Sequence, residues 1–231
     1  MKLTGISSIL NPKPNTLVFK TNSDKLNNIN YTIITEKAGK NISNYSYIVV
    51  KHPFISFIKA CELFGIKSEE PDIHPSAIIT NTEIGNNVTI QAGCVIGEEG
   101  FGFYKNNTGN LLNFPHIGKV LIKDNVSIFT NTTIARGALE DTVIGEGTKI
   151  ASLVMIGHGV NIGMNNIICA QVNISGKTKI GNNCFIGLKA CIRDNIEIGS
   201  NVTIGMGSVV TKNIPDNATV FGNPATIKDF S

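Results

Sequence analysis

His158 is the residue of this sequence best placed to do acid–base chemistry. It lies in the segment MIGHGVNIG between Gly157 and Gly159, which leave its side chain uncovered and let a ligand approach the backbone. An imidazole titrates near neutral pH, so His158 could act as a general base that removes a proton from an attacking group. The alternative is an incidental surface histidine at a turn.

The element that positions His158 is a repeat of six residues. An aliphatic side chain recurs at every sixth position, and a small or β-branched residue often precedes it by two. Glycine and then asparagine often follow, and both tolerate the backbone angles of a sharp corner. We therefore predict a triangular parallel coil of about 18 residues per turn, with stacked aliphatic ladders. The unbroken register comprises Ile144, Ile150, Ile156, Ile162, Ile168, Ile174, Ile180, Ile186, Ile192, Ile198, Ile204 and Val210.

Two interruptions break the repeat, at residues 98–116 and between Ile134 and Ile144. A coil of this kind accommodates extra residues only by looping them out, and such loops often carry function. His116 ends the first interruption; it is the second candidate base and a candidate substrate-binding residue, and a loop histidine that caps a strand is the alternative. His52 and His74 receive no role.

Metal chemistry has little support in this sequence. The five cysteines form no CxxC pair and no spacing typical of a zinc site, so we interpret them as small apolar residues. A γ-type carbonic anhydrase needs three histidines around a metal, and the coil lacks the HxxxxH spacing. We expect no metal cofactor.

The first 70 residues differ from the coil. Segments 16–19, 31–36 and 45–50 are typical of short strands, and 54–65 has apolar residues at helical spacing. We predict a small α/β domain over 1–70 and the coil over 71–231.

Composition excludes two further classes of protein. The net charge is +3 without a block of Lys and Arg, which argues against a nucleic-acid binder. No apolar run approaches the roughly 20 residues of a membrane helix, so we expect no membrane insertion and a cytoplasmic location.

The repeat resembles the left-handed parallel β-helix of the hexapeptide acyltransferases, and the left hand is implied by that resemblance alone. The order of segments also resembles the family that N-acylates UDP-3-O-acylglucosamine in lipid A synthesis. The matching segments are LTGISSI, PNTLVFKTNSDK, IVVKHPFISFIKACELF, IHPSA, EEGFGF, FPHIGKV, TTIARGALEDTVIG and MIGHGVNIG. The resemblance implies that His158 is catalytic and that residues 1–70 bind a nucleotide sugar.

Several residues depart from the family's pattern. Ala135 replaces an aspartate, Asn195 replaces the family's second histidine, and the uracil-holding motif retains Phe19 and Asn22 but has Lys25 in place of its second ring. The sequence also stops at a tail similar to those of small acetyltransferases. We therefore favour a short-chain acyltransferase that uses acetyl-CoA or another short acyl-CoA on a nucleotide-linked amino sugar for surface polysaccharide synthesis. The lipid A reaction itself and sugar O-acetylation are the alternatives.

The coil geometry suggests where a coenzyme A donor would bind. Steps of 18 residues from His158 lead to Gly176, Asp194 and Lys212, which would share one edge. The Gly176 amide would donate to a thioester oxygen, and Lys212 would meet a phosphate. Asp194 either orients substrate or is a solvated turn residue. Asn223 and Pro224 either pack against adenine or form a plain turn.

The resemblance also implies a homotrimer with active sites between subunits. A partner carboxylate for His158 is expected, and Glu140 and Asp141 are the nearest candidates in sequence. A purely structural solenoid is the non-enzymatic alternative, but the threonines do not form the regular rows of ice-binding coils.

Overall fold

The computed structural model describes residues 3, 5–7, 13–19, 31–35, 45–66 and 72–228. The chain divides into two compact units, Met1–Glu69 and Glu70–Ser231. The first contains a parallel sheet in the order β1-β2-β3-β4 and one helix. Its elements are β1 (Gly5–Ile6), β2 (Thr16–Phe19), β3 (Tyr31–Thr35), β4 (Tyr45–Val49) and α1 (Pro53–Leu63). The described helix has 11 residues, and no helix in the described ranges is long and apolar enough to cross a membrane.

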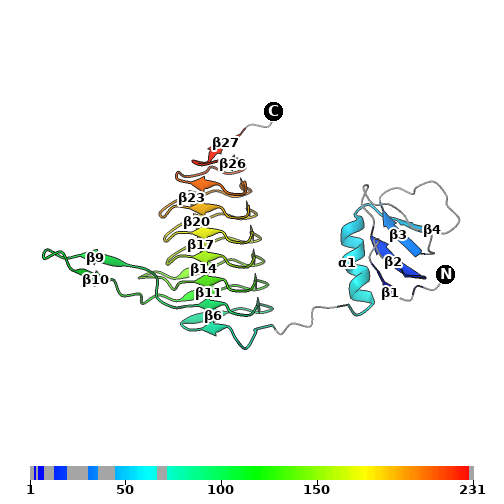
Figure 1. Cartoon of the computed structure of the whole chain (residues 1–231), viewed down its shortest axis with the longest axis horizontal. Helices are drawn as coiled ribbons and strands as arrows, with labels where there is room; N and C mark the ends of the chain where they lie inside the picture. Colours follow the sequence, from blue (N-terminus) through cyan, green and yellow to red (C-terminus); the bar gives the residue numbers. More distant parts are fainter. Residues whose placement is uncertain are drawn as a thin grey trace. The chain divides into compact units, whose positions relative to one another are not determined.

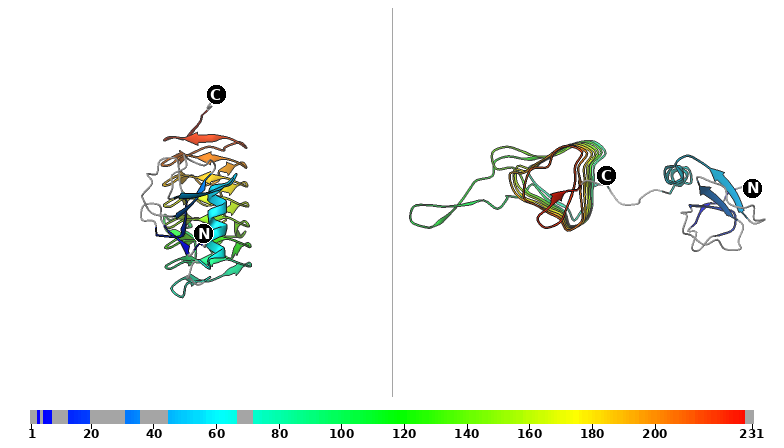
Figure 2. Two further views of the ribbon diagram at one scale, coloured as in Figure 1. Left: turned by 90° about the vertical axis from the view of Figure 1, so that its right-hand side faces the viewer. Right: turned by 90° about the horizontal axis from the view of Figure 1, so that it is seen from above.

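The second unit is the predicted parallel β-helix (Figures 1 and 2). Seen along its axis, the coil is a triangle whose sides are three stacked sheets. The first sheet comprises β6 (Thr82–Ile84), β11 (Val120–Ile122), β14 (Thr142–Ile144), β17 (Asn161–Ile162), β20 (Lys179–Ile180) and β23 (Glu197–Ile198).

The other two sheets complete the triangle. The second comprises β7 (Thr89–Ile90), β12 (Ser127–Ile128), β15 (Lys149–Ile150), β18 (Ile167–Ile168), β21 (Phe185–Ile186), β24 (Thr203–Ile204), β26 (Thr219–Phe221) and β27 (Thr226–Ile227). The third comprises β5 (Ile78–Ile79), β8 (Val95–Ile96), β13 (Thr133–Ile134), β16 (Met155–Ile156), β19 (Asn173–Ile174), β22 (Cys191–Ile192) and β25 (Val209–Val210).

The aliphatic repeat forms the core of the coil. On β17, for example, Ile162 is 1% exposed and pairs in register with Ile144 below and Ile180 above. Its strand neighbour Asn161 points outward and is exposed. Burial of one aliphatic residue per side of each turn therefore locks successive turns in a fixed register.

The first interruption is a protruding β-hairpin. Strands β9 (Phe103–Lys105) and β10 (Leu111–Asn113) pair antiparallel and extend away from the triangle (Figures 1 and 2). The second interruption widens the corner between β13 and β14. There the amides of Ile117 and Gly118 donate to carbonyls of the inserted segment 137–138. Both predicted loops are thus present, and they lie against each other at the base of the hairpin.

The register yields a test of stability with a matched control. We expect Ile162→Ala to lower the free energy of unfolding by about 2–5 kcal/mol, because it leaves a cavity in an otherwise filled ladder. Asn161→Ala, on the same strand but facing outward, should change it by less than about 0.5 kcal/mol. Urea denaturation followed by circular dichroism measures both. Equal losses would show that the ladder does not carry the stability of the coil.

Candidate functional site

His158 lies at a corner of the coil, directly after β16. Ile156 is 1% exposed and faces the core, so the chain turns at Gly157 and the His158 side chain leaves the coil, half-buried. A Cβ at Gly157 would lie 2.7 Å from the Gly176 nitrogen, so only glycine lets the two turns approach this closely. Gly159 has a φ of +65°, which also favours glycine. The two glycines therefore set the path of the backbone around the imidazole.

The predicted column of residues shares this corner. Met155, Asn173, Cys191 and Val209 pair in register, and the residues three positions further along are His158, Gly176, Asp194 and Lys212. A Cβ at Gly176 would lie 2.7 Å from Nε2 of His158, so the absent side chain leaves room for the imidazole. Asp194 accepts a hydrogen bond from the Asn195 amide at 2.7 Å, and Lys212 is exposed. The stacking is observed, and the ligand roles stay predictions.

Two cavities meet at His158. The first has a volume of about 660 Å³ and extends over the third sheet. Apolar side chains line much of it, including Val95, Phe101 and Met155, and Gly176 and Asp194 lie along its edge. The second has a volume of about 440 Å³, and its lining includes Lys177, Lys179, Glu140 and Glu197. His158 is thus positioned to contact a ligand in each.

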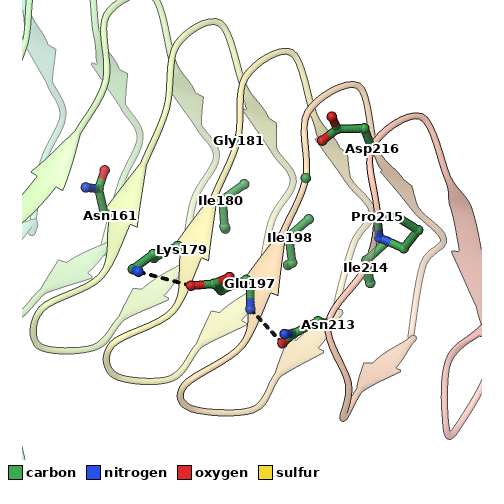
Figure 3. A pocket seen from close by; sticks show the side chains of 11 residues that line it. Asn161, Lys179, Ile180, Gly181, Glu197, Ile198, Asn213, Ile214, Pro215 and Asp216 are labelled. Carbon is green, nitrogen blue, oxygen red and sulfur yellow. Dashed lines mark hydrogen bonds and ion pairs between the residues drawn. The ribbon is translucent and has the colours of Figure 1, made fainter.

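A larger groove lies on the first sheet and holds none of the predicted site residues. Its volume is about 780 Å³ (Figure 3). Lys179 pairs with Glu197 at 3.0 Å, and the amide of Glu197 donates to the Asn213 side chain at 2.9 Å. Because these polar groups already have partners, the groove offers less chemistry than the corner at His158.

His116 is brought against His158 by the base of the hairpin. Its side chain is 2% exposed, and the two imidazole rings have centroids 5.3 Å apart at an angle of 81°. His116 lines neither cavity, which favours a role exerted through His158 over direct contact with substrate.

The expected carboxylate partner of His158 is not seen among the described residues. Asp141 accepts a hydrogen bond from the Lys119 amide at 2.8 Å, and Glu140 lines the second cavity without a hydrogen bond to His158. Nδ1 of His158 is buried and has no partner in the described part of the chain. The expectation therefore fails for Asp141, because the widened corner directs its side chain to the backbone of Lys119.

Burial is the main influence on the charge of His158. It lowers the pKa of the imidazole below 6.5, and the positive charges of His116 and Lys177 lower it further. One turn below, Arg136 forms an ion pair with Glu99 at 2.7 Å. A hydrogen bond from Arg136 lowers the pKa of the Glu99 carboxyl, so this pair stays charged.

The remaining predicted residues lie away from this corner. Asn223 and Pro224 occupy the turn between β26 and β27, and the peptide bond that joins them is cis. Phe19 ends β2 in the first unit, and Asn22 lies outside the described residues. No group of three or more His, Cys, Asp or Glu side chains in the described ranges is placed to hold a metal ion.

Sequence reasoning missed the contributions of Gly100 and Arg136. The signals were present in the segments EEGFGF and RGALEDT, which were read as family motifs and not as parts of a corner. Gly100 lies against both imidazoles, and a Cβ there would be 2.9 Å from Cβ of His158.

Comparisons with known proteins agree with this geometry. Residues 76–98 and 177–212 match the family described as the hexapeptide repeat of succinyl-transferase. The chain is 52% identical over 100 residues to UDP-3-O-acylglucosamine N-acyltransferase of Methylobacterium nodulans, covering 43% of this chain and 28% of that protein. It is 49% identical over 104 residues to the protein of the same name from Rhizobium meliloti, covering 45% and 29%. The chain thus spans less than a third of the length of these relatives.

Solved structures show the same fold. A UDP-N-acetylglucosamine acyltransferase from Bacteroides fragilis has a TM-score of 0.59 at 25% identity, covering 68% of this chain and 59% of that one. One from Campylobacter jejuni has a TM-score of 0.56 at 21% identity, covering 68% and 74%. The predicted resemblance to hexapeptide-repeat acyltransferases is confirmed. The relatives' names match the lipid A reaction, which was an alternative, better than the short-chain acyl transfer that the sequence favoured.

Gly176 provides a test of the space around His158. We expect Gly176→Ala to lower turnover by up to about 10²-fold, because its Cβ would lie 2.7 Å from Nε2 and displace the base. The backbone there does not have a positive φ, so the melting temperature should change little. Gly5→Ala, where a Cβ meets nothing within 4 Å, is the control. Full activity of Gly176→Ala would remove Nε2 from the mechanism.

The pH profile tests the lowered pKa of His158. A base must be unprotonated, and a lowered pKa keeps the imidazole neutral to lower pH than an ordinary histidine. We therefore expect the enzyme's own contribution to the acidic limb of kcat/KM, after the separately measured titration of the acceptor amine is divided out, to fall only below pH 6.5. An enzyme limb at or above that value would contradict the assignment of His158 as this buried base.

Proposed function

We propose that this protein transfers an acyl group from a thioester to the amine of a UDP-linked glucosamine derivative. The amine nitrogen attacks the thioester carbonyl carbon, a C–N bond forms and the C–S bond breaks. The observation that carries the proposal is His158, which lies where two cavities of different character meet. Each reactant would then reach the same imidazole from its own side.

His158 is the general base of this proposal. Its lowered pKa leaves the ring able to accept a proton at neutral pH, and Nε2 lies beside Gly176 at the wall of the first cavity. Nε2 takes the proton from the nitrogen as the C–N bond forms, and then returns it to the departing thiolate. Proton transfer therefore balances without another co-reactant.

The donor is assigned to the first cavity and to the corner column. The Gly176 amide has no hydrogen-bond acceptor among the described residues, so it is available to stabilise the oxyanion of the tetrahedral intermediate. Asp194 lines the same cavity, and Lys212 lies further along the column. A coenzyme A thioester fits this arrangement through a phosphate contact at Lys212. Asn223 and Pro224 remain candidates for the adenine end.

The acceptor is assigned to the second cavity. Lys177 lines it and provides a positive charge for an anionic sugar nucleotide, whereas Lys179 in the same cavity is paired with Glu197. The relatives' names support UDP-3-O-acylglucosamine as the first acceptor to test. Nucleotide-sugar binding by residues 1–70, including Phe19 and Asn22, stays a separate prediction from the resemblance.

We also propose that the coil acts as a homotrimer. Support comes from large apolar side chains that face outward from the coil, which association would bury. They include Met206 at 76%, Leu153 at 52%, Ile167 at 49% and Leu188 at 48%. Light scattering on the purified protein tests this part separately.

The proposed reaction is tested by mass spectrometry of products from a panel of donors and acceptors. The acceptors are UDP-3-O-acylglucosamine, other UDP- and dTDP-linked amino sugars, and their hydroxyl analogues. The donors are acetyl-CoA and longer acyl thioesters on coenzyme A or acyl carrier protein. We expect N-acylation of a UDP-linked amine, and His158→Gln should reduce turnover roughly 10²–10⁴-fold because it removes the base.

His74→Gln is the control, because among the described residues the His74 side chain bonds only with Ser76, near the entry of the coil. Product with hydroxyl acceptors alone would overturn N-transfer. Near wild-type turnover of His158→Gln would overturn the role of the base.

A further inference from the structure

The two buried imidazoles form an unusual pair. The ring of His116 meets His158 edge to face, and the Phe114 ring also lies edge to face with His116, with ring centroids 6.5 Å apart. Both ring nitrogens of His116 and Nδ1 of His158 are buried without a hydrogen-bond partner among the described residues. Burying such groups without partners is costly, so an apolar ring would fill the position of His116 at lower cost. The imidazole at this position therefore requires an explanation other than packing.

The glycines of the EEGFGF segment create the space for the pair. A Cβ at Gly100 would lie 2.9 Å from Cβ of His158 and 3.0 Å from Nε2 of His116. A Cβ at Gly102 would lie 3.1 Å from Cε1 of His116. Neither glycine has a positive φ, so the nearby imidazoles, and not backbone strain, disfavour a side chain here. This segment therefore encloses His116 against His158.

The charges around the pair come from each element packed on this corner. Lys177 follows Gly176 on the next turn, and Asp194 lies one turn further. Below, Arg136 is paired with Glu99, whose carboxylate also interacts with His116. The other charged residues that line the two cavities beside His158 are Glu98, Glu140, Lys179 and Glu197. Of these groups, only His116 is both buried and in ring contact with His158.

We propose that His116 is a positioning residue that acts through His158. It holds the imidazole of His158 with Nε2 beside Gly176, and it keeps the pair from carrying two positive charges. The inference rests on the proposed function only where it names His158 as the base. A protonated His116 at a ring distance of 5.3 Å repels a second proton on His158. His158 then remains neutral, as a base must be, over a wider pH range.

The decisive experiment is NMR titration of ¹³C,¹⁵N-histidine-labelled full-length protein without substrate. In the wild type, we expect coupled titration, in which the resonances of each imidazole also report protonation of the other. In His116→Gln and His116→Phe the titration midpoint of His158 should move to higher pH. His116→Phe retains a ring of similar shape, so a merely packing role predicts no movement in that variant. His74→Gln is the histidine control and should leave His158 unchanged.

Kinetics provide the second readout. We expect the acidic limb of kcat/KM to move to higher pH in His116→Phe, and turnover of His116→Gln to fall by up to about 10²-fold through misplacement of the base. Circular dichroism confirms that the coil is intact. The inference is overturned if the wild-type histidines titrate independently, or if His158 titrates in folded His116→Phe as in the wild type. If the acyl-transfer panel yields no product while the His158 titration shifts as expected, the proposed function is rejected but the role of His116 beside His158 is retained.

Discussion

Register between successive turns is the constraint on which the rest of this structure depends. Between Ile144 and Val210 each inward aliphatic residue packs on the one 18 residues away, so a slip of one residue would expose a whole ladder and bury polar side chains. The same register stacks the corners. Gly176 therefore lies one turn from His158, and its missing side chain becomes part of the space around the imidazole.

The candidate site lies where this regular coil is interrupted. The hairpin between β8 and β11 and the longer step between β13 and β14 both enter near His158. The first brings the buried His116, and the second gives the corner that carries Ala138 and Glu140 beside the second cavity. The regular coils provide a rigid column of stacked corners. The inserted segments line the two cavities beside one of these corners.

Sequence periodicity predicted the coil and the column of His158, Gly176 and Asp194, because spacing alone determines which residues stack. The same reasoning could not place His116, since the 98–116 insertion has no periodic relation to the turn that it covers. It also could not place Asp141, whose side chain bonds to the backbone of Lys119. The roles of Gly100 and Gly102 depend on contacts between inserted and regular segments, and no local pattern encodes such contacts. The choice of Phe19 and Asn22 rested on the family resemblance, and the choice of Asn223 and Pro224 rested on the turn in the carboxy-terminal tail. The roles of all four remain predictions.

The most direct test of the central claim is a crystal structure with a UDP-linked amino sugar and a non-hydrolysable thioester analogue bound together. The account predicts the acceptor nitrogen about 2.6–3.2 Å from Nε2 of His158, or one water away, with the analogue's carbonyl oxygen at the Gly176 amide. Ligands bound at full occupancy in the groove on the first sheet, with His158 contacting neither, would contradict it.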